Sequence, residues 1–420
     1  YVMMHPDGDA EMTKVIRETI NELAENVAAK ANRQLDEIVE VTFVGNPIMH
    51  HLLLGINPLE LGGAPFALAT DESVRIRARD LKLTLHTNTR CYVLPCIAGH
   101  VGADTAGMIL SEAPHKREAI TLLVDIGTNA EIVLGNKERL LAASSPTGPA
   151  FEGAQITCGQ RAAPGAIERV RIDRKTLEPK FKIIGCDLWS DEMGFSKQTK
   201  KTGITGICGS GIIEAIAEMY LAGILRQDGV INGSFAEKSE RIVSEDRTFS
   251  YILHDGEQHI HISQNDVRAI QLAKAALYAG IRLLMERLGI ESVDRIRLAG
   301  AFGNHIEPKF AMILGLIPDC NLKQVSSAGN AAGTGARIAL LNHESRNEIE
   351  EVVRQVEKVE TAVETNFQQH FVNAMALPHK IDKFPNLAKE VELPADNMSE
   401  NTYENATPTA KRRRRKTTNS

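Results

Sequence analysis

A buried strand that runs into an acidic glycine turn most constrains how this 420-residue chain can fold. Residues 120–124 are all β-branched or leucine, as in a buried strand, and Asp125 follows them directly. The turn after Asp125 contains a glycine and two polar residues, Gly127, Thr128 and Asn129. Two further strands are expected over 131–134 and 139–143. The sequence therefore predicts three antiparallel strands at the head of an α/β domain.

The turn after Asp125 also has the residue types of a phosphate site. A carboxylate at the end of a buried strand can hold hydrated Mg²⁺ while the backbone N–H groups of the turn face phosphate oxygens. Gly127 allows a close backbone approach because it has no Cβ. An ordinary hairpin turn has the same residues, so the hairpin alone leaves both interpretations open.

A glycine-rich segment before a helix is the second candidate. Residues 206–211 precede a predicted helix over 212–223, and its candidate ligand contacts are Gly209, Ser210 and Gly211. Free N–H groups and the positive end of the helix dipole attract an anion there, and Glu214 in the first turn could accept hydrogen bonds from ribose hydroxyls. Simple helix capping is the alternative. The chain has no Gly-Lys-Ser or Gly-Lys-Thr sequence, which excludes a P-loop.

The third candidate is a glycine turn after a strand predicted over 295–299. It consists of Gly300, Ala301, Phe302, Gly303 and Asn304. A flat ring could lie against the backbone at these glycines, although packing alone could also require them. An acidic hairpin, a glycine-headed helix, a long helix over 266–288 and this turn follow one another in a single stretch. The order of these elements favours a nucleotide site more strongly than any one of the motifs does.

The rest of the chain divides around this stretch. The first part has a helix expected over 9–33, strands over 38–44 and 91–95, irregular structure over 55–90 and a small-residue helix from 98 to 110. The predicted domains are 1–118, the remainder of a first ATPase lobe; 119–342, a second lobe with the nucleotide motifs; 343–393, a helical extension; and 394–420, a disordered basic tail.

Composition narrows the function classes. The net charge of −6 argues against a protein that mainly binds nucleic acid. No apolar run reaches the roughly 18 to 20 residues of a membrane helix, and no signal peptide is evident, so we expect a cytoplasmic protein without a membrane partner. The 6 cysteines contain no close CxxC pair, and no residue is assigned as a metal ligand.

Five segments of the chain together resemble a known family. The segments are 45–52, 99–104, 124–131, 148–154 and 298–304. The order of the nucleotide motifs is similar to the acetate and sugar kinase, heat-shock chaperone and actin superfamily, whose two ribonuclease H-like lobes close over ATP. These segments more closely resemble the reductive activators of corrinoid proteins, over roughly residues 1–342. The resemblance implies an α/β, two-lobe, actin-like ATPase fold with an N-terminally truncated first lobe.

The resemblance also implies a function. Such activators are ATP-driven and return the Co(II) corrinoid of a methyltransferase system to Co(I). It implies ATP and Mg²⁺ as cofactors, with Asp125 as the catalytic residue that positions magnesium or water. Phosphate would lie at Thr128 and Asn129, ribose at Glu214, and adenine at 300–303.

The partners implied are a corrinoid protein or corrinoid-dependent methyltransferase, a ferredoxin-type electron donor and a second copy in a homodimer. Family members carry a [2Fe-2S] domain, whose ligands are absent from this chain. The alternatives are a small-molecule kinase of the same superfamily and a non-catalytic, truncated binding partner.

Overall fold

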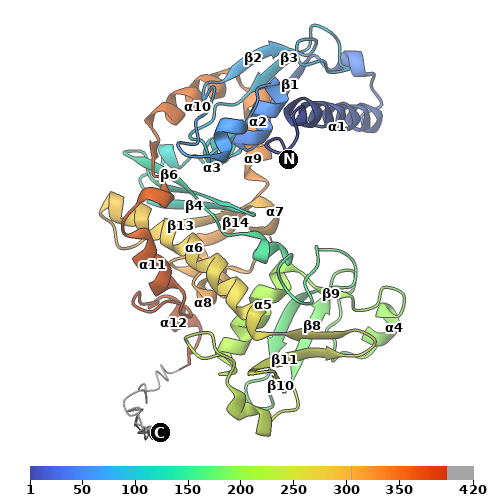
Figure 1. Ribbon diagram of the computed structural model, residues 1–420, viewed down its shortest axis with the longest axis vertical. Helices are drawn as coiled ribbons and strands as arrows, with labels where there is room; N and C mark the ends of the chain where they lie inside the picture. Colours follow the sequence, from blue (N-terminus) through green and yellow to red (C-terminus); the bar gives the residue numbers. More distant parts are fainter. Residues whose placement is uncertain (304, 395–420) are drawn as a thin grey trace, which may run out of the picture.

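A six-stranded sheet forms the centre of the computed structural model, which describes residues 1–303 and 305–394 (Figure 1). Its strand order is β14-β13-β4-β5-β6-β15. The strands are β4 (Thr121–Ile126), β5 (Ala130–Gly135), β6 (Leu140–Ser145), β13 (Arg295–Ala299), β14 (Val325–Gly329) and β15 (Glu357–Lys358). β4, β5 and β6 pair antiparallel, which confirms the predicted three-stranded hairpin unit, while β13 pairs parallel with both β4 and β14.

Both faces of this sheet are covered, which explains the continuous apolar run in β4. Leu122 and Val124 pack in the large core with α6 (Gln264–Leu288) and α8 (Pro308–Leu314). Leu123 lies on the other face, in a second core with α3 (Ala103–Glu112) and α9 (Ala331–Leu341). A strand buried on both faces has no polar side to present, so strict alternation is not expected.

The insertion, residues 149–263, lies between β6 and α6 and forms the lower part of the view in Figure 1. Its two small sheets have the orders β8-β7-β9 and β10-β11-β12. The elements are β7 (Ala166–Ile172), β8 (Pro179–Ile183), α4 (Phe195–Thr199), β9 (Gly206–Ile207), α5 (Gly209–Leu221), β10 (Ile242–Glu245), β11 (Thr248–Asp255) and β12 (His259–Ile262). A Cβ on Gly211 would overlap the carbonyl oxygen of Ile167, so α5 packs very closely on β7.

The N-terminal unit, residues 1–117, forms the upper part of the view. It contains α1 (Gly8–Lys30), β1 (Glu40–Phe43), α2 (Pro47–Leu54), β2 (Val74–Arg77), β3 (Arg90–Val93) and α3. The expectation of irregular structure throughout 55–90 is wrong at β2, which adds to the sheet edge as an antiparallel partner of β3. The strand was not predicted, because the residues that flank it are turn-rich and its partner β3 does not follow it directly in the sequence.

Two helices join the N-terminal unit to the central sheet. α3 follows the parallel pair β1 and β3, and α9 follows the parallel pair β13 and β14. A Cβ on Gly335 would overlap the carbonyl oxygen of Gly107, so the two helices cross with their backbones in contact. The same strand, strand, helix order thus occurs twice, and its two final helices pack together.

The C-terminal segment is partly built into the sheet. It contains α10 (His343–Gln355), β15, α11 (Phe367–Ala374) and α12 (Leu387–Glu390). Besides helices, the segment predicted as a helical extension over 343–393 contains the short strand β15, which pairs parallel with β6. The predicted disordered tail lies outside the described residues from 395 onward. Within the described chain, no helix combines the length and apolarity needed to cross a membrane.

Candidate functional site

A cavity of about 720 Å³ lies between the carboxyl end of β4 and the start of α5, and we call it the β4–α5 cavity. The central sheet contributes Asp125, Ile126 and Gly127, and the start of α5 contributes Cys208, Gly209 and Ser210. The remaining lining residues are Phe151, Glu152, Arg161, Ala162, Glu168, Ile184 and His305. Two of the three predicted motifs, the acidic hairpin and the glycine-headed helix, therefore face one cavity.

The third predicted motif touches the first. Gly300 has a φ of +87°, and a Cβ on it would overlap a carboxylate oxygen of Asp125. Only glycine combines that backbone conformation with so close an approach. Ala301, Phe302 and Gly303 continue as α7 (Gly300–Gly303), and Asn304 lies outside the described residues.

The hairpin turn is held in place by the segment that follows β6. Thr147 donates its hydroxyl to the carbonyl oxygens of Gly127 and Thr128, each at 3.0 Å, and the N–H of Gly148 donates to Thr128 at 2.9 Å. The Thr128 hydroxyl itself donates to Glu152 at 2.8 Å. A phosphate that met Thr128 would therefore compete with Glu152 for this hydroxyl.

Half-buried carboxylates gather behind the hairpin. Burial, and then the charge of Asp104, raises the pKa of Asp125 to about 6. Glu131, paired with Asp125 across β4 and β5, has a pKa raised to about 8 by burial and by both aspartates. Burial also raises the pKa of Asp104, which lies in the first turn of α3. A divalent cation would relieve this mutual repulsion, so the site suits Mg²⁺ held through Asp125.

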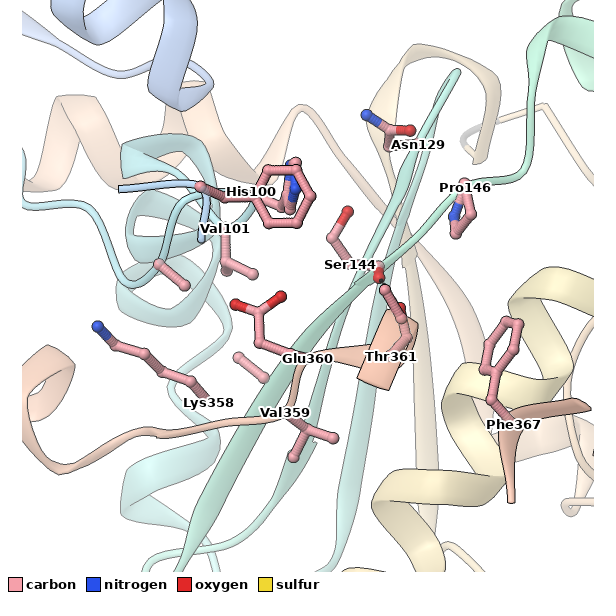
Figure 2. Close-up of a pocket in the computed structure, with 14 residues that line it drawn as sticks. His100, Val101, Asn129, Ser144, Pro146, Lys358, Val359, Glu360, Thr361 and Phe367 are labelled. Carbon is pink, nitrogen blue, oxygen red and sulfur yellow. Dashed lines mark hydrogen bonds between the residues drawn. The ribbon is translucent and has the colours of Figure 1, made fainter. Parts of the chain in front are cut away.

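Asn129 lies on a second cavity rather than on the β4–α5 cavity. This second cavity, of about 200 Å³, lies between the N-terminal unit, β6 and the C-terminal segment. Figure 2 shows Asn129 at its upper end, with His100 and Ser144 nearby and Glu360 below them. The hairpin thus separates two cavities: the carbonyl oxygen of Asn129 accepts the N–H of Gly127 at 3.0 Å, but Asn129 does not line the cavity that Gly127 and Ser210 share.

The structure places Glu214 in a buried ion-pair network and not on the β4–α5 cavity. Its side chain is 1% exposed, and it is not among the described residues that line the β4–α5 cavity. Its two carboxylate oxygens accept hydrogen bonds from Arg169 and Arg171, both at 2.6 Å. The N–H of Val170 donates to it as well, at 3.0 Å. With these partners, the carboxylate fixes α5 to β7.

Several cavity residues were not singled out as site residues from the sequence. They are Glu152, Arg161, Glu168 and His305, which line the cavity, and Asp104, which does not line it but whose charge acts on Asp125. Asp104 and Glu152 belong to motifs that carry the family resemblance, which was a usable signal. Arg161, Glu168 and His305 come from segments without a motif, and only the fold brings them to the cavity.

His51 and the two cysteines of the N-terminal unit have structural surroundings. His51 lies with Nδ1 at 2.9 Å from the carbonyl oxygen of Pro47 and accepts from the N–H of Ala69 at Nε2, at 3.0 Å. Cys91 and Cys96 pack in different apolar clusters, and burial raises the pKa values of their thiols to about 11 and about 12. An iron-sulfur cluster needs converging thiolates, and these two do not fit one. Among the described residues, no three His, Cys, Asp or Glu side chains are arranged to hold a metal ion.

Comparisons with known proteins agree with this architecture. The family described as the C-terminal domain of RACo, the ASKHA domain, matches residues 119–388, and the RACo middle region matches residues 1–117. A corrinoid activation enzyme, RamQ, of Eubacterium limosum is 34% identical over 88% of this chain and 61% of its own length. A reductase of a Co(II) methylated amine-specific corrinoid protein, from Methanosarcina barkeri, is 25% identical over 81% of this chain and 63% of its own.

One solved structure is also similar. The reductive activator for a corrinoid, iron-sulfur protein has a TM-score of 0.76 and 33% identity, over 90% of this chain and 59% of that protein. The chain thus spans about three fifths of the length of each of these relatives. With the sheet order, the three glycine motifs and both family matches in agreement, the chain has the actin-like ATPase fold and belongs to the RACo family of reductive activators of corrinoid proteins.

Proposed function

We propose that this chain binds MgATP in the β4–α5 cavity and couples ATP hydrolysis to the reductive activation of a corrinoid protein. The observation that carries the proposal is the convergence of Asp125, Gly127 and Ser210 on one cavity in a chain of this family. The names of the two curated relatives, both of which refer to corrinoid proteins, support the choice of partner.

In this proposal, each predicted motif contacts or positions one part of MgATP. Asp125 holds Mg²⁺ or orients the attacking water, and the backbone at Gly127 and Thr128 faces the phosphates. The N-terminus of α5, which starts at Gly209, offers N–H groups to the same anion. Gly300 leaves room beside Asp125, and the turn it opens faces the adenine. Mg²⁺ supplies charge neutralisation at the phosphates when it is bound.

The proposed reaction consists of two coupled steps. ATP and water give ADP and phosphate, while one electron from a ferredoxin-type donor reduces Co(II) to Co(I). We infer a ferredoxin-type donor because the described cysteines do not fit an iron-sulfur cluster. The homodimer and the cytoplasmic location remain predictions from the sequence, as do the domain boundaries.

The β4–α5 cavity is placed to couple nucleotide binding to motion. Its walls come from the central sheet and from the insertion, and Asp104 of the N-terminal unit lies behind Asp125. A nucleotide that binds the closed arrangement more tightly than the open one shifts the population toward closure. This is how hydrolysis would change the surface that a corrinoid protein meets.

A measurement of ATPase activity with and without a Co(II) corrinoid protein tests the proposal. We expect Mg²⁺-dependent hydrolysis that the corrinoid protein stimulates and that Asp125→Ala abolishes. Asp187→Ala is the matched control, because Asp187 is exposed in the insertion and does not line the cavity. Hydrolysis that depends on a small-molecule acceptor and ignores the corrinoid protein would contradict the proposal and favour the kinase alternative.

A further inference from the structure

The second cavity, of about 200 Å³, is lined by motif residues to which the proposed function gives no role. His100 and Asn129 belong to two of the five segments that carry the family resemblance. His100 comes from the N-terminal unit and Asn129 from the central sheet, while the C-terminal segment closes the cavity with Glu360 and Phe367. Three separate parts of the chain therefore build this cavity.

One wall of the second cavity is built around a strained residue. Phe66 has a φ of +56°, a left-handed conformation that bulky residues rarely adopt. The centroid of its ring lies 4.3 Å from that of His100, and both rings line the cavity. A Cβ on Gly99 would overlap the carbonyl oxygen of Phe66, so this motif glycine lets the two backbones meet. Strain of this kind persists only where the surrounding structure fixes the residue, and it clusters at ligand sites.

The other side of the second cavity offers acceptor oxygens. Glu360 directly precedes the short helix Thr361–Val363, yet its side chain does not cap that helix. Among the described residues, no hydrogen bond or ion pair engages the Glu360 carboxylate. Figure 2 shows this carboxylate directed toward His100, with Ser144 on the same cavity. Ser144 donates its hydroxyl to Glu131 at 3.4 Å, so its own oxygen is left to accept.

The charges around the second cavity favour a cation. Its ionisable lining residues are His100, Lys358 and Glu360. Lys358 is shared with a neighbouring cavity, of which the acidic residues are Asp71, Glu72 and Glu350. The ammonium group of Lys358 thus has carboxylates on its other side. Glu360 is the charge that the second cavity leaves unmatched.

We propose that the second cavity binds a compact organic ammonium ion between the Phe66 and His100 rings and the Glu360 carboxylate. Aromatic faces attract such ions, and a carboxylate balances their charge. The volume of about 200 Å³ is below the roughly 300 to 1,000 Å³ of sites for drug-sized ligands, so the ligand is small. Because the ion touches the N-terminal unit and the C-terminal segment at once, it opposes movement between them.

Calorimetric titration of the nucleotide-free chain with methylammonium and with tetramethylammonium tests this proposal, with sodium chloride at equal ionic strength as the blank. We expect saturable binding of at least one of the two ions. Glu360→Gln should weaken it roughly tenfold, as for the loss of a contact to a charged group. Phe66→Leu should weaken tetramethylammonium binding about fivefold, because this ion has no N–H to donate and relies on the ring faces. Phe66→Tyr keeps a ring and should restore the binding.

Two further variants separate this site from a general charge effect. Glu351→Gln removes an exposed carboxylate of the same C-terminal segment that does not line the cavity, so it should keep the wild-type affinity. Lys358→Met should strengthen the binding of a cation, because it removes a like charge. Acetate and phosphate are the anionic probes, and binding of either that Lys358→Met abolishes would show an anion site and overturn the proposal.

The outcomes are independent of the proposed function because these titrations contain no nucleotide. Failure of both ammonium ions to bind, or binding that Glu360→Gln leaves unchanged, overturns the ammonium site alone. A chain that binds an ammonium ion as described but binds no MgATP supports the ammonium site and overturns the proposed function.

Discussion

At the scale of single residues, Asp125 has the environment of a carboxylate built to meet a cation. Burial and the charge of Asp104 raise its pKa to about 6, so a substantial share is protonated in mildly acidic solution. Mg²⁺ binds the ionised form and must displace that proton. Under the proposed function, the affinity for MgATP is therefore linked to the titration of Asp125.

We expect MgATP affinity to rise from pH 5 to about pH 7 and then level off, as Asp125 ionises. Since ATP also titrates near pH 6, Asp125→Asn is the reference for the part that the ligand contributes. The variant should bind more weakly, by about tenfold, and its pH profile should lack the protein's share of the rise. Calorimetric titration at several pH values measures both. Parallel profiles for the two proteins would contradict the role given to Asp125.

Glu131 should make the protein less stable as the pH rises. Its pKa of about 8 in the folded state lies above its ordinary value of 4.5, so the folded state binds this proton more tightly than the unfolded state. The resulting stability is complete below about pH 4.5 and is lost as the pH rises through 8. Glu131→Gln removes this loss, so without Mg²⁺ it should be more stable than wild type at pH 8.5. Urea unfolding at pH 5.5 and 8.5 measures the difference, and an equal effect of the substitution at both values would contradict it.

The sequence located the hairpin residues but not the surroundings that decide their roles. Asp125 and Gly127 follow from a local pattern, because a strand, a carboxylate and a glycine turn are adjacent in the chain. Glu214 could not be placed this way, since its partners Arg169 and Arg171 lie 45 and 43 residues upstream. Glu168 and Arg161 carry no local signal, and the fold alone turns them toward the cavity.

At the scale of elements, the contact between α5 and β7 positions the start of α5. Because Gly211 has no Cβ, the helix can approach the backbone of β7 closely. The carboxylate of Glu214, farther along the helix, accepts a hydrogen bond from an N–H of the same strand. Cys208 donates its N–H to Ile167 at 3.0 Å, directly before the first turn. The predicted glycine-headed helix is therefore held by packing and charge, and its open end faces the cavity.

Glu214→Ala should destabilise the protein by about 3 kcal/mol, the lower end of what loss of one partner of a buried ion pair costs. The lower end applies because the Arg169 and Arg171 side chains remain about one third exposed and can turn to water. Chemical denaturation followed by circular dichroism measures the change. A loss below about 0.5 kcal/mol, the scale of an exposed pair, would show that Glu214 does not act as part of a buried ion-pair network.

Elements with a strong local pattern were predictable, and short strands that depend on a distant partner were not. The long helix α6 begins two residues before its predicted start and ends where expected, since Ser263 caps it through the N–H of Asp266. β2 and β15 each need a neighbouring strand, β3 and β6, to complete their hydrogen bonds. β15 has only two residues, and β2, although its residues alternate between apolar and basic, has only four.

At the scale of the whole molecule, the C-terminal segment ties the N-terminal unit to the central sheet. α10 bonds to the N-terminal unit through Glu350, which accepts from Arg75 at 2.7 Å and from Tyr92 at 3.0 Å. A few residues later, Glu357 starts β15 on the edge of the central sheet and pairs with Arg139. Any movement of the N-terminal unit relative to the central sheet must therefore change this connection and the contact between α3 and α9.

Recovery of the Co(I) absorbance tests most directly whether nucleotide chemistry in the β4–α5 cavity drives corrinoid reduction, as we propose. The assay combines this chain, a reduced ferredoxin and a Co(II) corrinoid protein, with and without MgATP, and uses Asp125→Asn as the matched variant. The account predicts that Co(I) appears only with MgATP and the wild-type chain. Equal Co(I) formation by Asp125→Asn, or formation that does not depend on MgATP, would contradict it.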